Sequence, residues 1–99
     1  MKKFAFILMG SHYTPETHTA DFTTAAGQTT SIRTARDFGE AKELVKRLHT
    51  EGYGCIELCG AFGEALTREL IALTENEVAI GFVTHLPEQD SLFEAFFAS

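Results

Sequence analysis

The chain has 99 residues, a formal net charge of −6 and 44% hydrophobic residues. This length predicts a single domain over residues 1–99, large enough to bury a core without a metal ion or a disulfide. The acidic balance and the lack of a basic stripe exclude nucleic acid as a partner. No apolar run approaches the length of a membrane span, so we expect no membrane contact.

The N-terminal residues imitate a secretory signal, because two lysines precede an apolar run at 4–9. The run is shorter than the roughly 7–15 residues of a signal sequence, and no cleavage site follows it. We therefore predict a buried strand and a cytoplasmic protein. Cys55 and Cys59 lie about 13 Å apart if their segment is extended. That distance is too long for a disulfide, and free thiols suit a reducing compartment.

The segment 11–28 is polar and rich in threonine, and Phe22 is its one clear apolar anchor. We interpret this segment as a polar loop or as a hairpin insertion that turns near Gly27, since the alternation of its residues allows both. The next segment, Thr29–Ala35, predicts a weak strand at an edge of the sheet.

A helix follows with clear signals at both ends. Asp37 can cap its first turn, and Glu40, three residues later, completes a capping box. Gly52 ends the helix. One face is apolar and should pack on the sheet; it carries Phe38, Ala41, Leu44, Val45 and Leu48.

The rest of the chain alternates strands with helices. We predict strands at 53–58 and 78–84, a helix from Phe62 that stops near Asn76, and a final helix opened by Pro87. Such alternation is typical of a parallel sheet with helices packed on it. We therefore predict an α/β fold with a four-stranded, mainly parallel sheet in the order 2-1-3-4, a flavodoxin-like half, and about three helices.

One face of this sheet lacks an obvious cover. Right-handed crossovers place the helices at 37–52 and 62–76 on the same face, yet the strand at 4–9 is apolar on both sides. The candidate covers are the final helix, the loop through Phe22 and a second subunit. The strand at 78–84 is also an edge without lysine or proline to protect it. Together with the broad apolar stripe of the final helix, this predicts a homodimer; the stripe consists of Leu92, Phe93, Phe96 and Phe97.

Reactive and polar residues gather where the predicted strands end, and ligands of open parallel sheets bind beyond these carboxyl ends. We expect Arg36 to bind an anionic group, Glu57 or His85 to move a proton, and Cys59 to line the pocket. The predicted catalytic residues are Glu57, His85 and Cys59, and the predicted substrate-binding residues are Ser11, His12, Arg36 and Gly60.

Each of these residues also has a purely structural interpretation. His85 can cap the final helix, Arg36 can neutralise a neighbouring acid, and Cys59 can be a small buried hydrophobe. Glu57 is the most informative, because Ile56 and Leu58 flank it in an inner strand. A buried carboxylate needs a partner, and we predict that Arg36 or a histidine supplies it.

No cofactor follows from the sequence. His12, His85, Glu57 and Cys59 are suitable ligand types for zinc, but no local spacing supports a metal site, and we predict none. The turn at 60–63 can offer backbone N–H groups to a small anion at a helix N-terminus. It lacks the glycine pattern of a nucleotide site.

Three stretches of the chain, FAFILMGSHY, IELCGAFG and GFVTHLPEQD, together resemble a family of short bacterial α/β proteins of unknown function. The resemblance covers nearly the whole chain and implies no activity. EGYGCIELCG is also similar to a strand of aldolase-type (β/α)8 barrels, in which an acid at the strand end meets the substrate. Two copies of this chain would be needed to close such a barrel.

Two functional hypotheses remain open. The first is a small anionic metabolite bound, with or without conversion, at the carboxyl ends of the strands. The second is a non-catalytic oligomeric or ligand-sensing module whose polar strand ends serve only capping and loop chemistry. A pocket that encloses Arg36, Glu57 and both His12 and His85 favours the first, and strand ends covered by the segment 11–28 favour the second.

Overall fold

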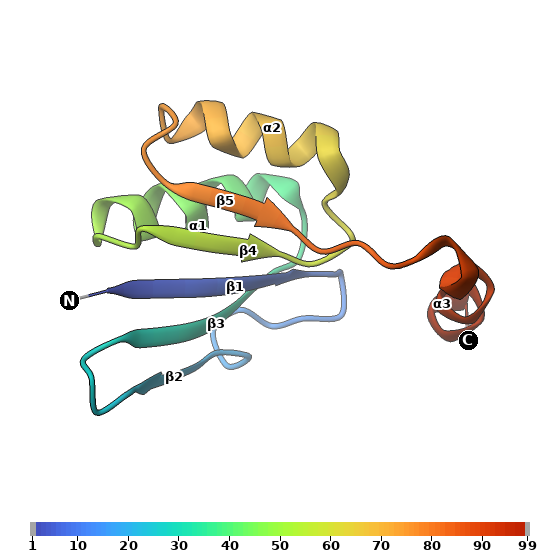
Figure 1. The fold of residues 1–99 in the computed structure, drawn as a ribbon, viewed down its shortest axis with the longest axis horizontal. Coiled ribbons are helices and arrows are strands. Elements are labelled where there is room, and N and C mark those ends of the chain that lie inside the picture. The colour runs from blue at the N-terminus through green and yellow to red at the C-terminus, as the bar shows by residue number, and fades with distance from the viewer. Residues whose placement is uncertain (1, 99) are drawn as a thin grey trace.

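A computed structural model describes residues 2–98 as a mixed α/β fold with one five-stranded sheet (Figure 1). The strand order is β2-β3-β1-β4-β5, in which β2 is antiparallel to β3 and all other neighbours are parallel. The predicted α/β class and the three helices are confirmed. The elements are β1 (Lys3–Met9), β2 (Ala20–Thr23), β3 (Thr29–Ala35), α1 (Phe38–Thr50), β4 (Cys55–Leu58), α2 (Gly63–Leu73), β5 (Ala79–Phe82), a short 3-10 turn η1 (Pro87–Gln89) and α3 (Asp90–Ala98).

The prediction of four strands is wrong, because β2 adds a fifth. The segment 11–28 takes the hairpin form, and β2 pairs with β3 from Ala20 opposite Ile32 to Thr23 opposite Thr29. Gly27 has a φ of +94° in the turn, a backbone conformation that glycine adopts readily. The four predicted strands keep their relative order, β3-β1-β4-β5, inside the larger sheet.

The core lies between one face of the sheet and the two helices α1 and α2. Ala5 and Ile7 of β1 and Ile56 of β4 are fully buried on this face. Both helices cover the same side of the sheet, as right-handed crossovers require (Figure 1). The helix side chains that complete the core include Ala41, Leu44, Val45, Leu48 and Leu70.

The start of α1 follows its sequence signals with one difference. The carboxylate of Asp37 accepts a hydrogen bond from the backbone N–H of Glu40 at 2.9 Å, which satisfies an otherwise unpaired donor of the first turn. The carboxylate of Glu40 does not return to Asp37 as in a capping box. It accepts from the backbone N–H of Arg36 at 2.7 Å and also binds the Arg36 side chain.

A chain of hydrogen bonds ties the hairpin to the core. The carboxylate of Asp21 accepts a hydrogen bond from the hydroxyl of Ser31 at 2.6 Å. Because Ser31 has only one proton to donate, the hydroxyl of Tyr53 donates to Ser31 across 2.7 Å. The Ser31 bond, and after it the guanidinium of Arg33 at 2.9 Å, lowers the pKa of Asp21 below its ordinary value.

No helix within residues 2–98 covers the second face of the sheet. The final helix, one of its expected covers, projects beyond the carboxyl ends of the strands (Figure 1), and none of its residues is buried. Phe22 is 60% exposed and does not anchor its segment. We name the segment 84–98 the C-terminal arm and the uncovered side of the sheet the open face. None of the helices within residues 2–98 has the length and apolar composition to cross a bilayer.

The Asp21 carboxylate predicts a specific acid sensitivity. Its pKa is lowered by folding, so its contribution is present above the ordinary carboxyl pKa and is lost as the pH falls below it. Asp21→Asn should therefore lower the free energy of unfolding near pH 7, and with it the melting temperature. For a half-exposed pair the loss should be about 1 kcal/mol or less. The difference from the unmodified protein should shrink between about pH 5 and pH 3.

Thermal unfolding followed by circular dichroism across this pH range measures the effect. Glu69→Gln, at an exposed position of α2, is the matched control. A gap between Asp21→Asn and the unmodified protein that stays constant with pH would contradict the assignment.

Candidate functional site

The open face is an apolar surface on the side of the sheet away from α1 and α2. Strand register places its side chains in rows that cross the sheet. One row contains Phe4 of β1 and Cys55 of β4, and the next contains Phe6 and Glu57. Further members are Leu8, Phe22, Thr30, Ile32 and Gly81. All of these residues are at least partly exposed, so the chain leaves a broad apolar surface in contact with solvent.

Glu57 lies on this face between β1 and the edge strand β5. Phe6 of β1 and Gly81 of β5 are its register partners on either side. Its carboxylate lies over Gly81, because a Cβ at that position would be 3.0 Å from Oε1 and 3.2 Å from Oε2 of Glu57. A larger residue than glycine would therefore push the carboxylate aside.

The predicted pairing of Glu57 with a basic group is wrong. Glu57 is only partly buried, and within residues 2–98 no hydrogen bond or ion pair satisfies its carboxylate. Arg36, its expected partner, binds Glu40 at 2.9 Å and Glu16 at 3.5 Å instead. A carboxylate on an apolar surface without a partner retains its demand for a proton donor or a cation.

Arg36 is neutralised by its own neighbours. Glu40, through its hydrogen bonds and its charge, raises the pKa of Arg36, and the same contacts lower the pKa of Glu40. Arg36 precedes the N-cap of α1, and Glu40 in the first turn of the helix reaches back to it. The structural interpretation of Arg36 as a neutraliser of a neighbouring acid is thus realised, and its closest ion pair is with Glu40.

The two cysteines are free thiols, as predicted. Burial raises the pKa of the Cys55 thiol, and the nearby charge of Glu57 raises it further, so this thiol remains protonated at neutral pH. The sulfur of Cys59 accepts a hydrogen bond from the backbone N–H of Met9 at 3.4 Å. That bond ties the end of β4 to the end of β1.

The two histidines predicted for the site, His12 and His85, have local partners. The ring of His12 folds back over Gly10, where a Cβ would come within 2.7 Å of it, and it packs on Tyr13 with ring centres 4.2 Å apart. His85 binds the carboxylate of Asp90 at 2.7 Å. Its ring stacks on Phe93 at 3.9 Å, so His85 holds the start of α3 in place.

The predicted site residues lie in or after the carboxyl-terminal parts of the strands, but contacts do not join them. Within residues 2–98, no hydrogen bond, ion pair or ring contact links any two of them. Ser11 and Gly60 lie exposed in turns. Their assembly into one site with Arg36, Glu57 and His85 stays a prediction. Nor do any three His, Cys, Asp or Glu side chains of the described residues gather closely enough to hold a metal ion.

Neither of two shallow depressions found among residues 2–98 is lined by Glu57, His12 or His85. One, of about 480 Å³, lies beside the start of α1 and is lined by Arg36 and Arg47 among several carboxylates. The loop before β2 forms one of its walls, because the hydroxyl of Thr34 donates to the carbonyl of His18 at 2.9 Å. This loop therefore covers the end of β3, as the second hypothesis requires.

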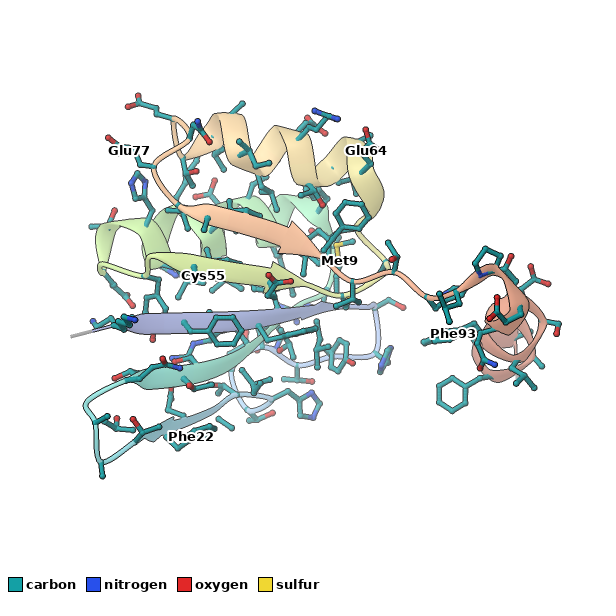
Figure 2. The ribbon with its side chains drawn as sticks, in the orientation of Figure 1. Met9, Phe22, Cys55, Glu64, Glu77 and Phe93 are labelled. Carbon is teal, nitrogen blue, oxygen red and sulfur yellow. The ribbon has the colours of Figure 1, made fainter. Side chains whose placement is uncertain are left out.

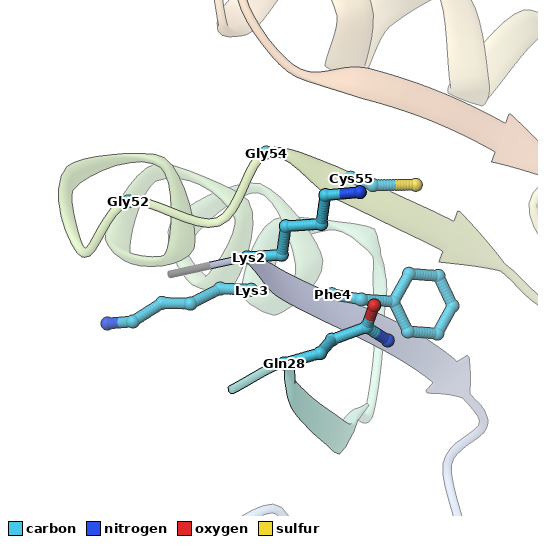
Figure 3. Close-up of a pocket in the computed structure, with 7 residues that line it drawn as sticks. All are labelled: Lys2, Lys3, Phe4, Gln28, Gly52, Gly54 and Cys55. Atoms are coloured by element: carbon cyan, nitrogen blue, oxygen red, sulfur yellow. The ribbon is translucent and has the colours of Figure 1, made fainter. Parts of the chain in front are cut away.

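The other depression, of about 520 Å³, lies at the amino end of the sheet, where sequence reasoning placed nothing. Figure 3 shows Lys2, Phe4, Gln28 and Cys55 around it. Lys2 had been interpreted only as part of a signal-like N-terminus. Its position directly before an apolar central strand was the available indication that it borders the sheet.

These features define a small, mixed α/β protein with one bare sheet face and the carboxylate of Glu57 on that face. The chain belongs to the family of unknown function DUF6506, whose family model matches residues 2–98. This match confirms the resemblance to a family without an assigned function. No curated protein and no solved structure matches the chain.

The contact between Glu57 and Gly81 can be tested by a double-mutant cycle. Alanine in place of a strand glycine ordinarily stabilises by roughly 0.5–1 kcal/mol. At Gly81 the new methyl group meets the carboxylate of Glu57, so that gain should be reduced or lost. In a Glu57→Ala background the gain should return, which gives a coupling of roughly 0.5–1 kcal/mol.

Urea unfolding of the four proteins measures the coupling. Gly54→Ala, where a Cβ would meet no atom within 4 Å, is the control and should show no coupling to Glu57. Additive effects at Gly81 and Glu57 would contradict the contact.

Proposed function

We propose that the protein is a homodimer that binds a small molecule on the open face, with Glu57 as the polar anchor. The observation that carries this proposal is the carboxylate of Glu57, partly buried on an apolar surface and without a partner among the described residues. Small-molecule sites are lined mainly by apolar side chains with a few convergent polar groups. The open face offers such a lining, with Phe6 paired with the acid across the strands.

The charge of the site favours one chemical class of ligand. A carboxylate attracts a cation or a hydrogen-bond donor and repels an anion. The neighbours of Glu57 on the open face, Phe6, Gly81 and Cys55, carry no positive charge. A ligand with an apolar body and an amine or amide group is therefore the best-supported class.

The small anion expected from the sequence is the second candidate. It would bind in the depression beside Arg36 and Arg47. There it would have to displace Glu40 and Glu16, which already occupy the Arg36 guanidinium. The geometry supports this site less well than the open face, and it supports binding rather than catalysis at both.

A homodimer is supported by the same bare face. Monomeric proteins seldom expose apolar patches larger than about 300–600 Å², and here both the open face and the C-terminal arm are apolar. β5 is in addition an edge strand of the sheet, as expected. The free thiols of Cys55 and Cys59 agree with the reducing cytoplasm proposed for the protein.

Sedimentation equilibrium at micromolar concentration tests the homodimer. We expect a mass of about twice 10.9 kDa. A single species of 10.9 kDa across the accessible concentration range would rule it out.

Glu57→Gln tests the anchor. The substitution removes a partly buried charge that has no partner, so it should raise the melting temperature of the free protein. An increase of about 1 kcal/mol in the free energy of unfolding corresponds to a rise of roughly 4–8 °C in the melting temperature of a domain of this size. The exposed Glu69→Gln should leave the melting temperature unchanged; a loss of stability at Glu57→Gln would mean that the carboxylate is paired.

Ligand binding is tested with two panels of small molecules at millimolar concentration, one of alkyl amines and amides, the other of phosphate and simple carboxylates. We expect members of the first panel to raise the melting temperature of the unmodified protein, and this increase to disappear in Glu57→Gln. Stabilisation by anions alone, lost in Arg36→Gln, would instead assign the site to the depression beside α1.

A further inference from the structure

The C-terminal arm is an ordered element that exposes its apolar side chains. The hydrogen bond between His85 and Asp90 and the stacking of His85 on Phe93 join its first turn to the preceding segment. Phe93, labelled in Figure 2, lies on the arm well away from the sheet. The most exposed apolar side chains of the arm are Leu86 at 64%, Leu92 at 63%, Phe96 at 72% and Phe97 at 76%.

We propose that the arm of one copy docks on the open face of a second copy, over the amino-terminal half of its sheet, and that the two copies exchange their arms reciprocally. This inference rests on the homodimer proposed above and specifies its interface. Each copy then supplies the α3 helix of its arm, which lies away from the sheet of its own chain, and an open face that no helix within residues 2–98 of its own chain covers. Reciprocal docking of this kind is a closed twofold interface, which satisfies both surfaces without forming fibres.

The area of apolar surface agrees with a stable dimer. An aromatic side chain buries about 150–250 Å², so the apolar residues of α3 at their observed exposures offer roughly 450–500 Å² per arm. Two arms and the two surfaces beneath them would bury close to 2,000 Å² in total, at the upper end of the roughly 1,200–2,000 Å² of standard interfaces.

The dimensions also fit. A helix of nine residues is about 14 Å long and about 10 Å wide. The sheet is about 23 Å long at β1 and about 19 Å across its five strands. One helix thus covers part of the open face and leaves room beside it for a small molecule at Glu57.

The amino end of the open face is the part that suits the arm. Phe4 and Cys55 form an apolar floor there, and Lys2 stands at its rim (Figure 3). The arm carries the acids Glu88, Asp90 and Glu94 and no lysine or arginine, so its charge complements Lys2. The same charge opposes binding of the arm to an anionic lipid surface.

A twofold arrangement brings these two parts together. The arm leaves its own sheet at the carboxyl ends of the strands (Figure 1). When two such sheets face each other with antiparallel strands, the carboxyl edge of each sheet lies over the amino edge of the other. The arm of one copy is thereby carried to the depression around Cys55 of its partner.

The experiment compares the full-length protein with Phe97→Asp and with the control Ser91→Asp, which adds the same charge at another exposed position of α3. Because Phe97 is exposed in the single chain, its substitution should leave folding intact, and circular dichroism checks this. In sedimentation equilibrium, the dissociation constant of the dimer should be at least about tenfold higher for Phe97→Asp than for the unmodified protein. Ser91→Asp should remain dimeric.

A second measurement locates the interface. N-ethylmaleimide labelling, mapped by mass spectrometry, should be several-fold faster at Cys55 in Phe97→Asp than in the unmodified dimer, with a smaller change at Cys59. A dimer that Phe97→Asp leaves intact, with unchanged Cys55 labelling, would overturn the arm exchange while the homodimer stands, as expected for pairing through the β5 edge. If the unmodified protein is a 10.9 kDa monomer, both the arm exchange and the homodimer are overturned. This holds even if Phe97→Asp accelerates Cys55 labelling, because in a monomer that result would mean that the arm folds back on its own sheet.

Discussion

The handedness of two crossovers determines what the rest of this molecule must do. The connections from β3 to β4 and from β4 to β5 run in the same direction across the sheet, so α1 and α2 cover the same face. The segment between β1 and β3 forms a hairpin strand instead of a helix. No element of the described chain therefore covers the opposite face, although β1 places Phe4, Phe6 and Leu8 there. Both the candidate ligand site and the proposed interface follow from this single asymmetry.

The sequence predicted the parts of the fold that depend on local signals. α1 has an apolar face and a capping aspartate, and it begins directly after Asp37 as expected. The relative order of the four parallel strands followed from their apolar content and from handedness. β2 was less predictable, because Ala20–Thr23 is short and all four of its residues are exposed. The Asp21–Ser31 contact that adds to its pairing with β3 joins residues ten apart in the sequence, so no local pattern indicates it.

The candidate site was harder to predict, because it depends on which charges find each other in space. The identity of the strand ends was readable, and topology does bring them to one edge. The partner of Arg36 was not assigned correctly, because Arg36 precedes the N-cap of α1 and its pairing with Glu40 depends on how the chain turns into the helix. An amphipathic pattern showed that α3 has an apolar face, but such a pattern does not say which surface covers it. Glu57 lies partly exposed on the open face, and the basic partner expected for it is not found within residues 2–98.

The position of β1 in the sheet has a consequence for how the protein is made. β1 lies at the centre, yet both strands that flank it, β3 and β4, come later in the chain. During synthesis this apolar strand emerges before either neighbour exists, and its second ladder, with β4, closes only after Cys55–Leu58 has left the ribosome. Pairing between segments so distant in sequence is slow, because a long loop must close before any contact is gained. Until then β1 presents an unpaired apolar edge, and exposed edges of this kind make incomplete chains prone to aggregation.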